Sequence, residues 1–234
     1  MLSDWLGVIF ALIFGALFGW LQDLSIWKPL RRKGVGLIPL MIVSIGFSLF
    51  MRYLFAFLWG PSRLMLNQSY DAMVTIFGVG LTAWNVWSAL ISIVLILAVA
   101  YALTYTKLGK ATRAVADNKP LAAASGINVD RVIRIVWIGS GALAAVSGVL
   151  VAYYQTVSYL SGAQILLLIF AAVTLGGLGT TYGALFGSII LSLFIEFSTF
   201  VIPTSLKYVV AMLMMILILL VRPQGLLGKK QRVG

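Results

Sequence analysis

Long, nearly uncharged apolar runs constrain this chain more than any other feature. They lie at about residues 5–22, 37–58, 84–105, 132–153, 164–179, 183–201 and 205–221. A run of about 18 or more apolar residues can cross a hydrocarbon core of about 30 Å. Backbone polar groups in lipid must be bonded within their own segment, so each run is expected to be a helix. The sequence therefore predicts an all-α, polytopic transmembrane bundle of about seven spans, forming one domain over residues 1–234.

Composition excludes several classes of protein. The chain is 62% hydrophobic and 10% charged, whereas soluble domains carry about 25% charged residues. It has no cysteine and no histidine, which excludes thiol chemistry, histidine-based catalysis and the usual zinc sites. It also lacks the G-x-x-x-x-G-K-[ST] pattern of a P-loop. We therefore expect no enzyme and no cofactor, and any ATP use must reside on a separate polypeptide.

The positive charges indicate a membrane topology. The net charge is +11, but the basic residues sit between apolar runs, which argues against nucleic-acid binding. All but three of the 17 basic residues follow the first, third or last run. The exceptions are Arg52, Arg63 and Lys207. If the helices alternate, the basic segments share one side, and that side is cytoplasmic. The N-terminus is then outside and the C-terminus inside, and the first run, without a basic region before it, is no signal peptide.

One cytoplasmic segment, residues 106–131, predicts a short helix outside the membrane. Asp117 and Asn118 are residue types that cap helix N-termini. Pro120 fits a first helical turn, and residues 121–125, LAAAS, favour helix.

The end of that short helix is predicted as well. Gly126 suits the left-handed position after a helix, and Ile127 can pack back on the preceding turn. Asn128 or Asp130 can cap the next membrane helix. A rigid helix with small side chains could dock in a cleft of another protein, while the alternative is an ordinary connecting loop. The candidate docking residues are Asp117, Asn118, Ala122, Ala123, Ala124, Gly126 and Ile127.

A glycine cluster at residues 176–179 leaves two interpretations open. At membrane depth, the break would point the N-terminus of helix 183–201 into a pathway and suit a carboxylate. At the cytoplasmic surface it would be a tight helical hairpin. Tyr182 replaces the last glycine of G-x-G-x-x-G, so this is no dinucleotide site. The candidate pathway residues are Thr174, Gly176, Gly177, Gly179 and Glu196.

Glu196 is the one acid inside an apolar run. An intramembrane carboxylate is costly, which makes it a functional hypothesis. The alternatives are that it reaches the interface or pairs with Lys207. Arg52 is interpreted as a snorkelling anchor in an aromatic belt, and Trp84 and Trp87 likewise.

Small residues four apart predict close helix packing. The pairs are Gly15 with Gly19, Ser140 with Ala144, and Gly183 with Gly187. A substrate path lined by small residues is the alternative. In the outer segment 60–82, the alternation over residues 74–77 predicts a short strand.

Several motifs together resemble the branched-chain amino acid (LIV-type) ABC permeases. They are RAVADN at 113–118, AAASGINVDRV at 122–132, WKPLR at 27–31, LGGLG at 175–179 with GALFG at 183–187, and RPQGLLG at 222–228. The resemblance covers nearly the whole chain. In that family the segment at 106–131 is a variant of the loop that docks on the ATPase. Family members usually begin with further helices and an Asn-Phe-Ala-His-Gly-type segment that this chain lacks, so the resemblance implies a shortened homologue, a fragment or a late start codon.

The resemblance implies an importer in a bacterial inner membrane. Its partners would be two ABC ATPases, a homologous second permease and an extracytoplasmic solute-binding protein facing residues 60–82. The substrate would be a branched-chain or related amino acid, with urea or another small solute as an alternative. A stand-alone secondary transporter and a non-transporting assembly subunit are the remaining hypotheses.

Overall fold

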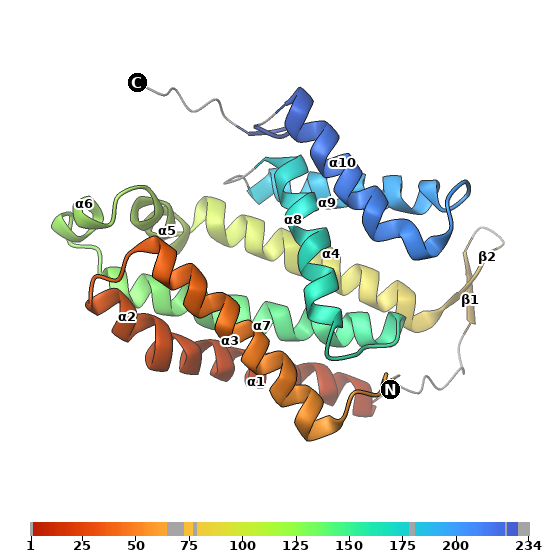
Figure 1. Ribbon diagram of the computed structural model, residues 1–234, viewed down its shortest axis with the longest axis horizontal. Helices are drawn as coiled ribbons and strands as arrows, with labels where there is room; N and C mark the ends of the chain where they lie inside the picture. The colour runs from red at the N-terminus through yellow and green to blue at the C-terminus, as the bar shows by residue number, and fades with distance from the viewer. Residues whose placement is uncertain (1, 65–72, 77–78, 178–180, 223, 229–234) are drawn as a thin grey trace. The chain divides into compact units, whose positions relative to one another are not determined.

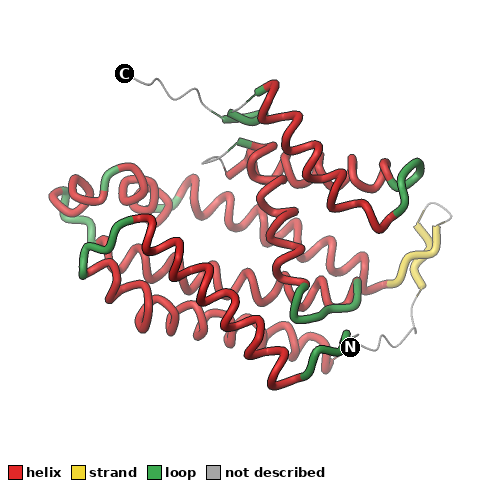
Figure 2. Tube along the Cα trace, viewed as in Figure 1, coloured by secondary structure: helices red, strands yellow, loops and turns green. Residues whose placement is uncertain are grey.

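The computed structural model divides into two compact units. It describes residues 2–64, 73–76, 79–177, 181–222 and 224–228. Unit 1 is Met1–Tyr159 and unit 2 is Leu160–Gly234. Helices make up most of both (Figures 1 and 2).

Unit 1 contains seven α-helices among its described residues. They are α1 (Leu2–Gln22), α2 (Lys28–Arg32), α3 (Leu37–Trp59), α4 (Ala83–Tyr105), α5 (Lys107–Asp117), α6 (Lys119–Ala124) and α7 (Val129–Tyr154). A π-helical turn, Asp23–Trp27, joins α1 to α2. Unit 2 contains α8 (Ser161–Gly176), α9 (Thr181–Ser198), a 3-10 turn (Thr204–Leu206) and α10 (Lys207–Val221).

Each of the seven predicted apolar runs contains a helix over most of its described residues. Among the described residues, four helices are long and apolar enough to cross a membrane: Trp5–Arg32, Leu37–Trp59, Ala83–Tyr105 and Val129–Tyr153. The apolar helices of unit 2 have 16, 18 and 15 residues. At about 1.5 Å per residue each falls short of a core about 30 Å thick. The structure is a helical membrane bundle.

The first helix continues beyond the predicted end at residue 22. Pro29 has no N–H, which would end an ordinary helix ladder. Here the π-helical turn precedes the proline, and the N–H of Lys28 donates to the carbonyl of Asp23. The apolar helix therefore runs on to Arg32.

Helices α1 and α7 form the main contact of unit 1. A Cβ at Gly15 would strike the backbone of Gly141, and one at Gly19 would strike the carbonyl of Trp137. The close approach predicted for Gly15 and Gly19 is confirmed. On α7 the prediction was wrong, because Ser140 and Ala144 are exposed and the contact is made one residue further along.

The loops at one end of unit 1 meet each other. Leu64 and Val157 exchange two backbone hydrogen bonds of 2.9 Å. Strands β1 (Met73–Ile76) and β2 (Val79–Thr82) form an antiparallel hairpin, which confirms the short strand except at Phe77, outside the described residues. In Figure 1 this hairpin lies at the end of unit 1 opposite α2, α5 and α6.

Aromatic side chains gather at the same end as the hairpin. Trp84 lies 4.3 Å from Tyr153 between ring centroids, and the rings of Trp84 and Trp87 are each 6.0 Å from Trp5. Tryptophan and tyrosine are typical of membrane–water interfaces. This end of unit 1 therefore has the composition of an interface.

The core of unit 2 is small and apolar. Its buried residues are Ala171, Ala172, Leu175, Leu191, Ile195 and Ala211. A Cβ at Gly176 would overlap Gly183, and one at Gly187 would overlap the carbonyl of Ala172. The predicted close packing at Gly183 and Gly187 is confirmed.

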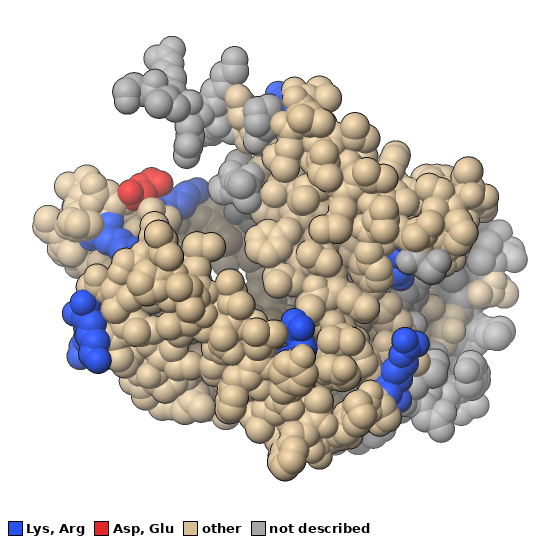
Figure 3. Space-filling view, in the orientation of Figure 1, with Lys and Arg blue, Asp and Glu red and all other residues tan. Residues whose placement is uncertain are grey.

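Large apolar side chains are exposed on most helices. Phe57 is 85% exposed and Leu37 82% exposed, and α3 has no buried residue. On the face drawn in Figure 3, charged side chains are few and most of the surface is uncharged. Such a surface suits contact with lipid or with another membrane subunit.

Candidate docking helix and glycine break

Helix α6 begins at a side-chain cap. Asn118 has an extended backbone, and its N–H donates to the carbonyl of Ala114 at 3.1 Å, closing α5. Its Oδ1 accepts from the N–H of Leu121 at 3.0 Å, opening α6. Pro120 lies in the first turn, where an N–H would have no helical partner. The predicted N-cap is confirmed, whereas α5 itself was not anticipated.

Helix α6 ends in a Schellman motif. Gly126 has φ of +83°, which glycine adopts without the penalty of a Cβ. Its N–H donates to the carbonyl of Ala123 at 3.0 Å, and the N–H of Ile127 donates to that of Ala122 at 3.1 Å. These are the paired hydrogen bonds of the motif. The predicted ending at Gly126 is confirmed.

Two of the candidate docking residues hold α6 in place. Ala122 is 3% exposed and clusters with Val115 of α5 and Val132 of α7. Ile127 packs against the same cluster. These side chains anchor the helix; Ala122 is buried and Ile127 is partly buried.

The other candidates face outward. Exposed residues of this group are Asp117, Asn118, Ala123, Ala124 and Gly126. They surround Leu121, which is 65% exposed. The exposure of Leu121 could not be predicted from the sequence, because six helical residues are too few for a periodic pattern to distinguish an outward leucine. The surface formed by Leu121, Ala123, Ala124 and Gly126 is called the α6 face below.

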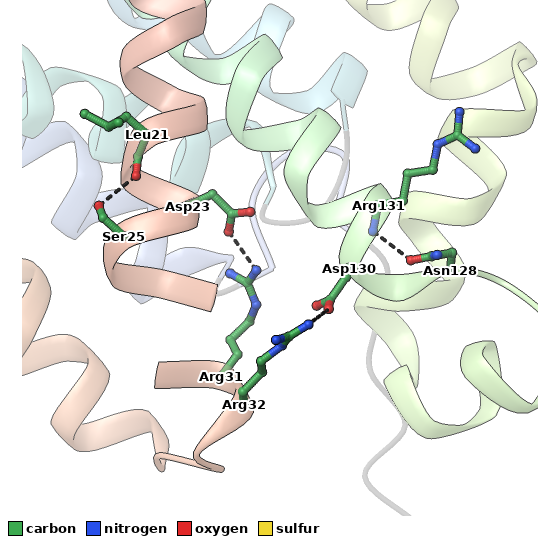
Figure 4. Close-up of polar contacts among 8 residues, drawn as sticks. All are labelled: Leu21, Asp23, Ser25, Arg31, Arg32, Asn128, Asp130 and Arg131. Atoms are coloured by element: carbon green, nitrogen blue, oxygen red, sulfur yellow. Dashed lines mark hydrogen bonds and ion pairs between the residues drawn. The ribbon is translucent and has the colours of Figure 1, made fainter. Parts of the chain in front are cut away.

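Helix α7 follows α6 with only four residues between them. Asn128 caps it by accepting from the N–H of Arg131 at 3.0 Å, one of the two predicted caps. Asp130 in its first turn lies 3.7 Å from Arg32 (Figure 4). The two side chains are 68% and 44% exposed, so this pair contributes little stability. Because this connection is short, a displacement of α6 would be transmitted to α7.

A buried ion pair lies in the turn between α1 and α2. Asp23 is 1% exposed and accepts from the Nη2 of Arg31 at 2.7 Å (Figure 4). Trp27 stacks on Trp137 of α7, with ring centroids 5.5 Å apart. The pairing of Asp23 could not be predicted from the sequence, because the π-helical turn changes the phase of the helix between Asp23 and Arg31.

The glycine break is covered by the C-terminal segment of unit 2. Gly177 has φ of +109° and its Cα lies against the backbone of residues 224–228. The N–H groups of Leu226 and Leu227 donate to the carbonyls of Leu175 and Gly176 at 2.8 and 3.0 Å. The break thus lies beside a segment that follows the last apolar helix.

Of the other described candidate pathway residues, Thr174 lies beside the break, since a Cβ at Gly225 would strike its carbonyl, but Glu196 does not. The hydroxyl of Thr174 donates to the carbonyls of Phe170 and Ala171 in its own helix. Glu196 lies exposed in the last turn of α9, far along that helix from the break. No ion pair links it to Lys207 in the part of the chain that the structure describes, and Gly179 lies outside that part.

The family model for the branched-chain amino acid transport system permease component matches residues 1–219. The chain belongs to this permease family. It is 30% identical over 239 residues to the high-affinity branched-chain amino acid transport permease LivH of Salmonella typhimurium, covering 98% of this chain and 77% of that protein. The Escherichia coli K12 LivH is 29% identical over 231 residues, covering 96% and 74%. BraD of Pseudomonas aeruginosa is 28% identical over 240 residues, covering 94% and 73%.

No solved structure matches this permease. Within unit 2, two motifs on which the resemblance rests are neighbours in space. The carbonyls of Leu175 and Gly176, which begin the LGGLG motif, accept hydrogen bonds from the N–H groups of two leucines in the RPQGLLG motif. Sequence order alone places these two motifs more than 40 residues apart.

Proposed function

We propose that this chain is the membrane-spanning permease subunit of an ABC importer for branched-chain or related amino acids. Its relatives are named as permeases for branched-chain amino acids. The observation that carries the ATP-driven part of the proposal is α6, a capped and anchored helix whose outer surface is free. Two separate ATPases supply the energy, and a second permease and an extracytoplasmic binding protein complete the importer.

The proposed orientation places the N-terminus outside and the C-terminus inside a bacterial inner membrane. The distribution of basic residues supports it. The bonded loops at Leu64 and Val157 support the alternation of the helices, because alternating helices require both loops on one side. Residues 60–82 then face the binding protein. Seven spans require the three short helices of unit 2 to cross with their flanking turns or in a locally thinned bilayer.

The proposed mechanism is alternating access driven through α6. The ATPase grips the α6 face, whose small side chains allow a close approach. The anchors Ala122 and Ile127 and the cap Asn118 keep α6 rigid, so that its motion passes to α7. Helix α7 packs along α1 through Gly15 and Gly141, so the two move together. ATP binding and hydrolysis thereby rock the bundle between outward- and inward-facing states.

The substrate path through Thr174, Gly176, Gly177, Gly179 and Glu196 stays a prediction. A path along the break would require residues 224–228 to move away. The covered break and the helix-bonded hydroxyl of Thr174 fit the surface hairpin, the alternative interpretation from the sequence.

Co-purification with candidate ATPases tests the proposal. The variant is Gly126→Arg, and the matched control is Gly34→Arg. Both glycines have positive φ, of +83° and +65°, and neither would bring a Cβ within 4 Å of another group. The two variants therefore suffer similar backbone strain and gain the same charge. We expect wild type and Gly34→Arg to recruit an ATPase and Gly126→Arg to lose it.

Equal recruitment of the ATPase by the two variants would contradict the proposed docking role of α6. Leucine uptake into proteoliposomes holding the whole importer is the second measurement. Uptake that needs ATP supports the importer, whereas uptake driven by an ion gradient without ATPase would identify a secondary transporter.

A further inference from the structure

A hollow of about 410 Å³ lies in unit 1 where α2 ends and α3, α6 and α7 begin. Its apolar walls come from Val35, Gly36, Leu37, Leu40, Val129 and Ile133. Its charged residues are Arg31, Arg32, Lys119 and Asp130. Neither the α6 face nor the glycine break contributes to it. The hollow therefore has a cationic half, formed by the two arginines and the lysine, and an apolar half.

The cationic half has hydrogen-bond donors that are not engaged within the described residues. Arg31 uses Nη2 for Asp23, but its Nε is buried and has no partner among the described residues. Arg32 is 68% exposed and lies 3.7 Å from Asp130, a loose contact. Lys119 is exposed and forms no ion pair within the described segments. An anion entering the hollow would meet Arg32 and Lys119 without first breaking a strong pair.

The apolar half leads into the membrane. Leu37 and Leu40 lie in the first turn of α3, a helix of 23 residues with no buried side chain. Ile133 lies at the start of the facing span, α7. Because the hollow lies at the starts of two long apolar helices, we expect it at the depth where lipid headgroups meet acyl chains. A free anion would match only the charged half, whereas a phospholipid matches both.

We propose that this hollow binds one anionic phospholipid of the leaflet on the α6 side. Its phosphate contacts Arg32 and Lys119, drawing Arg32 away from Asp130, and an acyl chain lies along Leu37, Leu40 and Ile133. Basic pockets between transmembrane helices are suited to anionic headgroups. This proposal goes beyond transport, because it requires neither ATPase nor amino acid.

Native mass spectrometry of the full chain in a neutral detergent tests the proposal. The probes are phosphatidylglycerol and phosphatidylcholine with the same acyl chains, and inorganic phosphate. The variant is Arg32→Gln with Lys119→Gln. Its control is Lys33→Gln with Lys110→Gln, which removes two exposed cations from the same two segments but none that lines the hollow.

We expect wild type and control to retain phosphatidylglycerol in preference to phosphatidylcholine. Each lining cation removed should weaken phosphatidylglycerol binding about fivefold, and the double variant about 25-fold. Circular dichroism should show the same helix content in all three proteins, since the substituted side chains are exposed.

Four results would overturn the proposal. One is equal retention of the two lipids by wild type, and another is equal loss by variant and control. Complete competition by inorganic phosphate would indicate a free-anion site. Unchanged lipid binding together with loss of ATPase recruitment in the double variant would assign the hollow to the docking surface instead.

Discussion

Helices α6 and α8 of this permease each end at a glycine with positive φ, and the surroundings of these two glycines differ. Around Gly126, at the end of α6, no group lies within 4 Å of where a Cβ would be. Around Gly177, at the end of α8, the backbones of Gln224 and Gly228 occupy that space. The same local chemistry thus ends one helix at an open surface and the other under a segment of its own chain.

This difference suggests that the two helix ends have different roles. An open, rigid helix end can receive another protein without any rearrangement. A covered helix end is part of the packing of unit 2. The predictions below test this contrast with matched substitutions, beginning with the largest effect.

Gly177→Val should have the largest effect. It combines a left-handed penalty of about 1–2 kcal/mol with overpacking of about 1–3 kcal/mol. We expect a large loss of folded protein in the membrane, measured as yield and thermal stability in detergent. The control is Gly162→Val in α8, where no group lies within 4 Å. Comparable losses in the two variants would show that Gly177 is not covered as described.

Gly126→Val should cost only the left-handed penalty, about 1–2 kcal/mol, because no group lies in the way. The loss should be confined to α6. Amide hydrogen exchange over residues 119–127 should accelerate, while exchange in α8 stays unchanged. A loss of total folded protein as large as that of Gly177→Val would contradict the contrast.

Asn118→Ala should weaken the start of α6 by about 1 kcal/mol, the usual value of a side-chain cap. The amide of Leu121 loses its acceptor and should exchange several times faster. Ser125→Ala serves as control, because its exposed hydroxyl only donates to a carbonyl of the same helix. Equal acceleration in both variants would mean that Asn118 does not hold α6.

Leu121→Ala should have the smallest effect on stability, within about 0.5 kcal/mol, since the side chain lies on the surface. Recruitment of the ATPase should nevertheless fall, because the variant removes the largest apolar group of the α6 face. Unchanged recruitment, measured by co-purification, would show that the partner does not use this leucine.

The sequence was most informative where structure depends on a few adjacent residues. Asn118 and Gly126 mark the two ends of α6 because capping is local chemistry. The apolar runs predicted membrane helices because lipid demands internally bonded backbone. No local rule could identify the residues of α7 that face α1, and Ser140 and Ala144 were chosen in error.

Contacts between distant segments could not be predicted either. The ion pair of Asp23 with Arg31 depends on a π-helical turn. The hydrogen bonds from residues 226 and 227 to α8 depend on how α10 packs against α8. The ends of α6 could be predicted from the nine residues 118–126 alone. Whether the glycine break is open or covered depends on how the whole of unit 2 packs.

Cysteine labelling gives the most direct test of α6 as the docking element. The chain has no cysteine, so Ala124→Cys and Ser62→Cys each introduce a single exposed thiol, one on α6 and one on the loop after α3. A membrane-impermeant maleimide should label Ala124→Cys only in everted vesicles, with bound ATPase protecting it, and Ser62→Cys only in right-side-out vesicles. Labelling of Ala124→Cys from the outside, or from neither side in the absence of ATPase, would contradict the proposed role of α6.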